Sequence, residues 1–292
     1  MQWSELASTF LGANLDGGAF VMRNAKCRTS LLPMLCFFLP LIASCGTLEN
    51  GRGWGQDALY PVNGKRVSKA LYNAATDWGT LIPAGGAVVS SLDDFDERVN
   101  SWATGRTPIF GSMDSASRAA NYLFGILQTE VLVTALATPS GEDSKEWVYS
   151  KAKGLSVELG AELVTAGVTE GLKSVSNRER PSSGDNSFPS GHSSGAFTNA
   201  VLCNRNLQSI AMSDNLRLAL EIGNYVLASA TAWGRVEANG HWLSDVLAGA
   251  AIGYFFGAFL HDGFMGLPED KPAQAKVVPL RGGAMLSFSF AF

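Results

Sequence analysis

Two of the three histidines lie beside arginine or a helix-start sequence in the second half of the chain. His192 follows Pro189-Ser190-Gly191, and His241 follows Arg235 with five residues between them. An imidazole can attack as a nucleophile or carry a proton near neutral pH. Arginine side chains bind anionic oxygens. Brought together, such residues would suit transfer of a phosphoryl group.

Lys173 and Arg180 form the first of three clusters, with six residues between them. Lys173 stands at the end of a predicted helix and Arg180 in the loop that follows, so both can converge on one anion. Arginine offers a planar fork to phosphate oxygens, while lysine acts as a point charge. Alone, two such cations are more typical of a solvated surface.

The second cluster, Ser190-Gly191-His192, predicts the start of a helix. Ser190 suits the N-cap position, and Gly191 lets the backbone approach a ligand closely. Free N–H groups at a helix N-terminus attract anions. His192 would then project toward that anion, although a single histidine in a turn is more often a capping or surface residue.

The third cluster is Arg235, His241 and Asp245. The spacing of four between His241 and Asp245 predicts that they share one face of a helix. The carboxylate can accept a hydrogen bond from one imidazole nitrogen and fix the tautomer, leaving the other nitrogen free to attack. A His–Asp pair on a helix surface is the alternative.

Taken in order, K-x6-RP, PSGH and R-x5-H-x3-D resemble the signature of the type 2 phosphatidic acid phosphatase superfamily. That superfamily includes bacterial non-specific acid phosphatases, lipid phosphatases and vanadium haloperoxidases. The resemblance spans roughly residues 80–262, and its specific part is 173–245. It implies a helical bundle of the acid phosphatase/vanadium haloperoxidase type. Gly234 departs from the pattern, because the family usually has a serine there that can donate to phosphate.

The resemblance also implies a role for each residue. His241 takes the phosphoryl group as phosphohistidine, and Asp245 orients it. His192 protonates the leaving alcohol and later activates water, and the bound phosphate keeps it protonated. The phosphoryl oxygens are held by Lys173, Arg180, Ser190, Gly191 and Arg235. Since three cations stabilise the charge, neither a metal nor another cofactor is expected.

Composition limits the other classes of function. Hydrophobic residues make up 46% of the 292 residues and charged residues 16%, which suggests a large core and proximity to a membrane. The formal net charge is −4. A nucleic-acid partner is not expected, because such binders usually present a basic face.

The N-terminal region resembles a bacterial lipoprotein signal. Basic residues at 23–28 precede an apolar run, Leu31 to Ala43, that is too short for a membrane span. Cys45 follows Ile42-Ala43-Ser44 and would be lipidated. We expect translation to start at Met22. The alternative is a buried N-terminal helix that ends in cysteine.

This signal predicts a membrane-anchored lipoprotein of the bacterial cell envelope. Gly46 rather than aspartate follows the cysteine, so by resemblance to Gram-negative lipoproteins the outer membrane, facing the periplasm, is the expected location. Cys203, the one cysteine outside the N-terminal region, is expected to be a buried apolar residue.

Hydrophobic periodicity predicts helices over 119–137, 154–173, 214–233 and 241–260, and therefore an all-α domain. Segment 154–173 carries a leucine-rich stripe, with Glu158 and Glu162 on another face. Glycines at 249, 253 and 257 give the last helix a face without side chains, which lets another helix approach, and we expect it to be a buried central helix.

We expect four regions along the chain. Residues 1–44 are an upstream segment plus signal peptide, 45–78 a tether, 79–265 the phosphatase domain and 266–292 a tail. The end of the tail alternates between apolar and small residues, as in a short strand.

The expected function is hydrolysis of phosphomonoesters or diphosphates. A lipid anchor favours amphiphilic substrates such as phosphatidic acid, lipid A or polyprenyl diphosphate, and soluble esters remain an alternative. The rival functions are a vanadate-dependent haloperoxidase and a non-catalytic envelope lipoprotein. The sequence does not indicate an oligomeric state.

Overall fold

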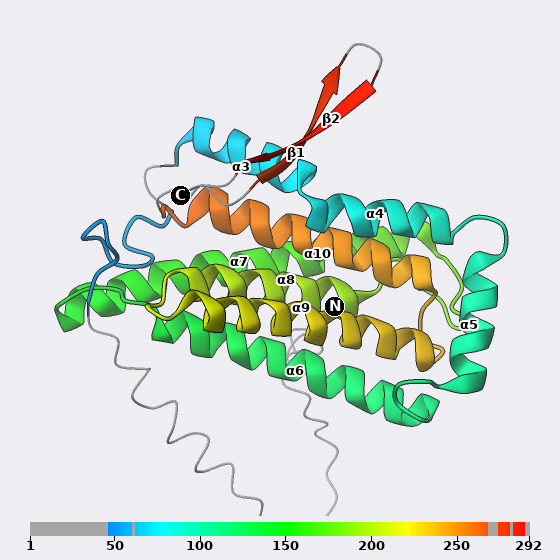
Figure 1. The fold of residues 1–292 in the computed structure, drawn as a ribbon. Helices are drawn as coiled ribbons and strands as arrows, with labels where there is room; N and C mark the ends of the chain where they lie inside the picture. Colours follow the sequence, from blue (N-terminus) through cyan, green and yellow to red (C-terminus); the bar gives the residue numbers. More distant parts are fainter. Residues whose placement is uncertain (1–45, 60–61, 268–273, 281–282, 290–292) are drawn as a thin grey trace, which may run out of the picture. The chain divides into compact units, whose positions relative to one another are not determined.

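The computed structural model describes residues 46–59, 62–267, 274–280 and 283–289. In these residues the chain forms eight helices followed by two strands (Figure 1). The helices are α3 (Gly64–Thr76), α4 (Trp78–Ser90), α5 (Phe95–Arg106), α6 (Met113–Ala137), α7 (Ser144–Ser176), α8 (Gly191–Gln208), α9 (Asp214–Glu237) and α10 (Leu243–Phe264). The all-α prediction for the domain is confirmed, and each of the four predicted helices lies largely within one of these.

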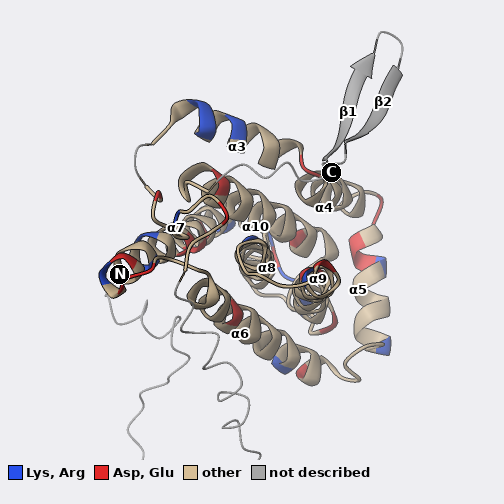
Figure 2. Cartoon of the chain, turned by 60° about the vertical axis from the view of Figure 1, so that its left-hand side comes forward, with Lys and Arg blue, Asp and Glu red and all other residues tan. Residues whose placement is uncertain are grey.

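Helices α8 and α10 pack against each other more closely than side chains would allow. A Cβ atom at Gly253 would lie 2.0 Å from the carbonyl oxygen of Ser194, and one at Gly249 would lie 2.5 Å from that of Ser190. The predicted glycine face of α10 therefore has α8 as its partner. Charged side chains are sparse along α4, α8 and α10 (Figure 2).

Contacts between the helices define their directions. Thr169 Oγ1 lies 3.0 Å from Ser194 Oγ, and Thr165 Oγ1 lies 3.2 Å from Thr198 Oγ1, so α7 runs antiparallel to α8. The glycine contacts make α10 parallel to α8. Helices α8 and α10 therefore begin at the end of the bundle where α7 finishes. Helix α5 runs across this end (Figure 1).

Helix α7 turns the stripe that carries Glu158 toward the bundle, and not its leucine-rich stripe. Glu158 is fully buried, together with Thr165 and Thr169, whereas Leu159 and Leu163 are each 50% exposed. The periodicity located the two stripes correctly, and the packing against α8 decides which one faces the interior. Polar side chains of α7 pack inward because α8 presents hydroxyl groups to them.

Apolar side chains also face outward on other helices. Leu218, Ile222 and Val226 of α9 are each more than half exposed. Two helices, α6 and α10, are long and apolar enough to cross a membrane by length and composition. Of the apolar window in α10, 56% is buried, against 28% in α6. The prediction that α10 is a central helix is therefore confirmed.

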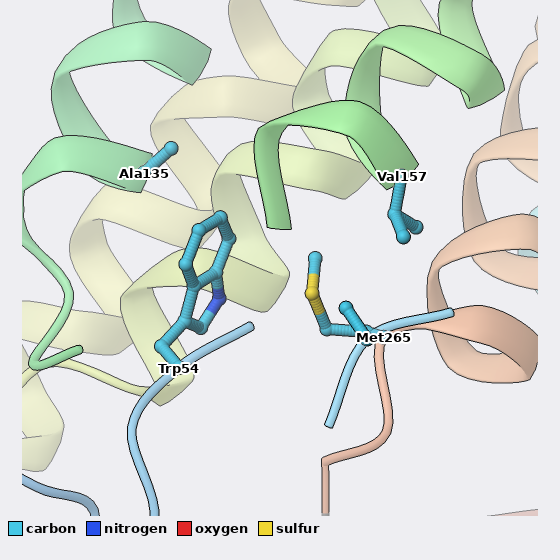
Figure 3. Close-up of a cluster of buried hydrophobic side chains, with 5 residues drawn as sticks. Trp54, Ala135, Val157 and Met265 are labelled. Atoms are coloured by element: carbon cyan, nitrogen blue, oxygen red, sulfur yellow. The ribbon is translucent and has the colours of Figure 1, made fainter. Parts of the chain in front are cut away.

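The tether predicted over 45–78 is wrong for most of that stretch. Trp54 is fully buried in a cluster with Ala135, Val157 and Met265 (Figure 3). The backbone N–H of Trp54 donates to the carbonyl of Pro139 at 2.7 Å. Residues 64–76 then form helix α3, which packs on α10. The polar composition of this stretch did not predict that Trp54 would be buried and hold it against the bundle.

The end of the chain forms a hairpin. Strand β1 (Gln274–Leu280) pairs antiparallel with β2 (Gly283–Ser289), with Gln274 opposite Ser289. The predicted strand character of the tail agrees with β2. The predicted signal peptide, the start at Met22 and the lipidation of Cys45 lie outside the described residues. Cys203 is buried with a free thiol, as expected.

Candidate active site

The three clusters come together at the end of the bundle where α8 and α10 begin. Lys173 lies in the last turn of α7 and Arg235 in the last turn of α9. Ser190 is the N-cap of α8, and its backbone N–H donates to the carbonyl of Asp245 at 3.0 Å. Arg180 lies in the loop between α7 and α8. In the sequence, this loop connects Lys173 at the end of α7 to Ser190 at the start of α8.

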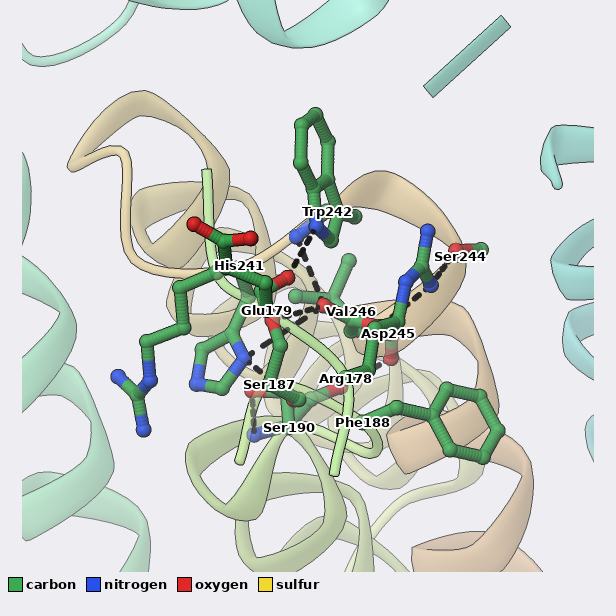
Figure 4. A network of polar contacts seen from close by, with 12 residues as sticks. Arg178, Glu179, Ser187, Phe188, Ser190, His241, Trp242, Ser244, Asp245 and Val246 are labelled. Carbon is green, nitrogen blue, oxygen red and sulfur yellow. Dashed lines mark hydrogen bonds and ion pairs between the residues drawn. The ribbon is translucent and has the colours of Figure 1, made fainter. Parts of the chain in front are cut away.

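His241 is oriented by a backbone carbonyl. Its Nδ1 lies 2.8 Å from the carbonyl oxygen of Ser187 (Figure 4), whereas Asp245 Oδ2 is 3.8 Å away, too far for a hydrogen bond. A carbonyl can only accept, so Nδ1 carries the proton and Nε2 of the neutral ring keeps its lone pair. The predicted direct His241–Asp245 hydrogen bond is therefore absent, although a free nitrogen remains.

His241 and Asp245 also do not share a helix face. Helix α10 begins at Leu243, so His241 lies in the loop before it. Asp245 instead accepts from the backbone N–H of Trp242 at 2.9 Å and from the Ser187 hydroxyl at 2.5 Å. The carboxylate thus holds the residue whose carbonyl orients His241.

Asp245 is fully buried and ionised. Burial alone would raise its pKa, but the neighbouring His241, the Ser187 hydroxyl, the Arg178 guanidinium and the Trp242 N–H together lower it. Arg178 Nη1 lies 2.7 Å from Asp245 Oδ1. The negative charge is therefore kept close to His241 through the physiological pH range.

Arg235 offers an unused donor. Its buried Nε has no hydrogen-bond partner among the described residues. Burial lowers the pKa of Arg235, and the nearby Arg180 lowers it further. Unsatisfied buried donors are rare and costly, and two guanidinium groups repel each other. An anion between them would satisfy both groups.

Lys173 and Arg180 have local partners that an anion could replace. Lys173 Nζ pairs with Glu170 Oε1 at 2.5 Å, on an exposed side of α7. Arg180 Nε donates to the carbonyl of Asp185 at 3.0 Å. A Cβ at Gly191 would lie 3.2 Å from Lys173 Nζ, so the glycine leaves room for the lysine beside the start of α8.

His192 lies within this group of cations. Burial lowers its pKa to about 4, and the charges of Arg235, His241, Lys173 and Arg180 contribute in that order. The other four side chains therefore lie within electrostatic range of the His192 ring. Sequence reasoning had assigned all five to one pocket, and the structure brings them together.

Two residues of α6 position the His192 ring. Its Nε2 lies 2.8 Å from Asn121 Oδ1, and its ring centroid lies 5.4 Å from that of Phe124. Phe124 fits against α8 because residue 195 is glycine, where a Cβ would come within 2.7 Å of the phenyl ring. No sequence cluster pointed to α6.

Close packing between α9 and α6 explains why residue 234 is a glycine. A Cβ at this position would lie 3.1 Å from both the Ala116 carbonyl oxygen and the Ala120 Cβ atom of α6. The glycine therefore allows α9 to approach α6 directly beside Arg235. A serine hydroxyl here would meet α6.

Family comparison agrees with this geometry. Residues 155–266 match the family model of the PAP2 superfamily. This stretch contains all three clusters. The matched stretch starts within α7 and ends just after α10, so α3 to α6 lie before it.

Two known proteins resemble the chain. A lipid A 1-phosphatase from Porphyromonas gingivalis is 34% identical over 103 residues, which are 35% of this chain and 22% of that protein. The chain therefore spans about a fifth of that relative's length. The crystal structure of a transmembrane PAP2 type phosphatidylglycerolphosphate phosphatase from Bacillus subtilis matches 67% of this chain and 94% of that one, with a TM-score of 0.47 and 19% identity.

Sequence reasoning missed four residues around the candidate site: Asp96, Asn121, Arg178 and Ser187. Arg178 lies inside the K-x6-RP spacing, so its position next to Arg180 was visible. The others carried no signal, because Ser187 acts through its carbonyl and Asp96 and Asn121 come from helices before the clusters.

Proposed function

We propose that this PAP2 domain is a phosphatase that hydrolyses phosphoesters through a phosphohistidine on His241. The observation that carries the proposal is the hydrogen bond from His241 Nδ1 to the Ser187 carbonyl. It leaves Nε2 with a lone pair in a pocket where three cationic side chains gather. A nucleophile and a set of anion-binding cations are the two requirements of metal-independent phosphoryl transfer.

In the first step, Lys173, Arg180 and Arg235 bind the phosphoryl oxygens. The Nε2 lone pair of His241 attacks phosphorus while the bond from phosphorus to the leaving oxygen breaks. His192 gives its proton to that oxygen. The cations stabilise the charge that spreads over the phosphoryl oxygens in the transition state.

In the second step, water attacks the phosphorus of phosphohistidine. His192, now neutral, takes a proton from that water, and the P–N bond breaks. Phosphate leaves, and His241 regains its free Nε2. The proton stays on Nδ1 and remains hydrogen-bonded to the Ser187 carbonyl throughout, so the ring keeps its orientation in both steps.

His192 must be protonated to act as the acid, yet its pKa in the free protein is about 4. Burial and the nearby cations Arg235, Lys173 and Arg180 cause that low pKa. A bound phosphate dianion reverses the sign of the local charge and raises the pKa of His192. Substrate binding therefore supplies the condition under which the acid works.

We propose phosphorylated lipids as the substrate class. The names of both similar proteins support this, as does the apolar exterior of α7 and α9, which suits contact with lipid chains.

We further propose that the chain is a lipoprotein of the bacterial envelope, attached through a lipid on Cys45 after removal of a signal peptide. The apolar run and small residues before Cys45 support this.

Release of phosphate from a panel of lipid and soluble esters tests the proposal. Wild-type protein should release phosphate in EDTA and should be inhibited by orthovanadate. His241→Gln and His192→Gln should nearly abolish release. His261→Gln is the matched control, because His261 is a buried histidine beside Asp262 at the other end of α10. Wild-type turnover in the His241 variant, or loss of activity in EDTA, would refute the mechanism.

A further inference from the structure

A continuous chain of charged contacts connects helix α5 to His241. Asp96 of α5 is buried, and its Oδ2 lies 2.9 Å from Arg178 Nη2. Arg178 Nη1 lies 2.7 Å from Asp245 Oδ1 (Figure 4). Asp245 Oδ2 accepts from the Ser187 hydroxyl, and the Ser187 carbonyl accepts from His241 Nδ1. One guanidinium therefore bridges two buried carboxylates.

We propose that Asp96 and Arg178 are positioning residues for the reaction, holding Asp245 and Ser187 so that the Ser187 carbonyl keeps the His241 ring in its attacking orientation. This inference rests on the proposed phosphatase function. It assigns a role to α5, which lies before the residues that match the family model.

The Arg178 guanidinium is fixed on several sides. Its Nη1 also donates to the Ser244 hydroxyl at 2.7 Å. Its Cζ atom lies over the Trp242 ring, 5.7 Å from the ring centre. Trp242 Nε1 in turn donates to the carbonyl of Glu179 at 2.9 Å. A guanidinium so constrained has one available position, which suits a bidentate bridge rather than a mobile surface contact.

Asp96 also fixes the start of α10. Its Oδ1 accepts from the backbone N–H of Ser244 at 2.8 Å, and its Oδ2 accepts from the Ser244 hydroxyl. A carboxylate in the first turn satisfies a free N–H and interacts favourably with the helix dipole. Asp96 therefore holds both the guanidinium and the helix that carries Asp245.

Among the described residues, no side-chain hydrogen bond or ion pair joins Asp96 or Arg178 to the three phosphate-binding cations. Arg178 and Asp96 contact Asp245, Ser244 and Trp242, whereas Lys173 contacts Glu170 and Arg180 contacts Asp185. Changing Asp96 or Arg178 should therefore misplace the nucleophile and leave phosphate binding in place. That difference separates positioning from a general loss of structure.

The test uses Asp96→Asn and Arg178→Lys in the full chain. Asparagine keeps an oxygen for the Ser244 N–H but turns an N–H₂ group toward Arg178 and the Ser244 hydroxyl, so both of these donors lose their acceptor. Lysine keeps the charge but not the two-pronged geometry. Asp262→Asn is the matched control, because it breaks a two-pronged Arg205–Asp262 pair at the opposite end of the bundle.

We expect kcat to fall about 10- to 100-fold in Asp96→Asn and Arg178→Lys, the loss typical of a nucleophile displaced by roughly an ångström. KM and orthovanadate inhibition should stay near wild type. The Asp262→Asn control should keep its kcat. The kcat of Ser244→Ala, which removes one hydroxyl and no charge, should lie between those of the wild type and Asp96→Asn.

Nitrogen-15 NMR of the histidine rings provides a readout that does not need activity. The chain has three histidines, so His→Gln variants can assign each signal. We expect His241 to carry its proton on Nδ1 in the wild type and to mix tautomers in Asp96→Asn. A wild-type tautomer and wild-type kcat in that variant would overturn the inference. An inactive wild type with the expected tautomers would instead overturn the proposed function alone.

Discussion

At the scale of single residues, the orientation of the His241 ring depends on a backbone carbonyl rather than on a carboxylate. The pattern R-x5-H-x3-D predicted that Asp245 would bind His241, and the structure places the Ser187 carbonyl there instead. Every residue has a backbone carbonyl, so no residue type marks that acceptor. Ser187 is visible only once the loop before α8 is folded against α10.

The low pKa of His192 predicts a proton movement on binding. The free site holds His192 neutral at pH 7, since its pKa is about 4. A bound phosphate raises that pKa, so the protein should take up a proton from solution. Calorimetry of phosphate binding at pH 7, in two buffers that differ in ionisation enthalpy, measures the number of protons.

The matched variant for this measurement is His192→Gln. It should bind phosphate with less proton uptake than the wild type, because the group that gains the proton is missing. Equal uptake in both proteins would place the proton on the phosphate or elsewhere. Proton release on binding would contradict the charge reversal itself.

At the scale of elements, periodicity found the helices and the glycine face of α10. It could not say which face of α7 turns inward, because that depends on which neighbours the helix meets. Helix α8 presents Ser194 and Thr198, and the threonines of α7 pair with them. The leucines of α7 are left outside. Long-range pairing of this kind leaves no periodic signal.

Replacing a glycine by alanine should change the stability of the protein in opposite directions in α10 and α7. Gly253→Ala should destabilise the protein by about 1–3 kcal/mol, since a Cβ would lie 2.0 Å from the Ser194 carbonyl oxygen. Gly160→Ala on α7 is the control, because a Cβ there has nothing within 4 Å. It should stabilise by up to about 1 kcal/mol through helix propensity.

Thermal unfolding of both variants gives the comparison. A Gly253→Ala protein as stable as the wild type would show that α8 and α10 do not approach as closely as described. Destabilisation by Gly160→Ala would show that the outer face of α7 is packed against something in solution.

At the scale of the whole molecule, Gly46 and the candidate site lie at opposite ends of helix α7. Gly46, which follows Cys45 directly, pairs with Gly141 just before α7 begins. Lys173 lies in the last turn of α7. With 33 residues at about 1.5 Å each, that helix separates the two by about 50 Å. An anchor at Cys45 alone would therefore hold the site away from the lipids around it.

The apolar exterior of α7 and α9 predicts membrane association without the anchor. Cys45→Ala protein should still sediment with membranes, because Leu159, Leu163 and Ile222 remain exposed. Fractionation of cells that express the variant measures this. Complete transfer to the soluble fraction would assign membrane attachment to the lipid on Cys45 alone.

The most direct test of the account is to trap the phosphorylated protein. Rapid acid-free quenching of wild-type protein with a labelled phosphoester should yield phosphate that is stable to alkali and labile to acid, located on His241. His241→Gln should give none. His192→Gln should still accept phosphate from an ester with a good leaving group but should hydrolyse it slowly. Labelled phosphate on a serine or an aspartate, or labelled His241→Gln, would contradict the account.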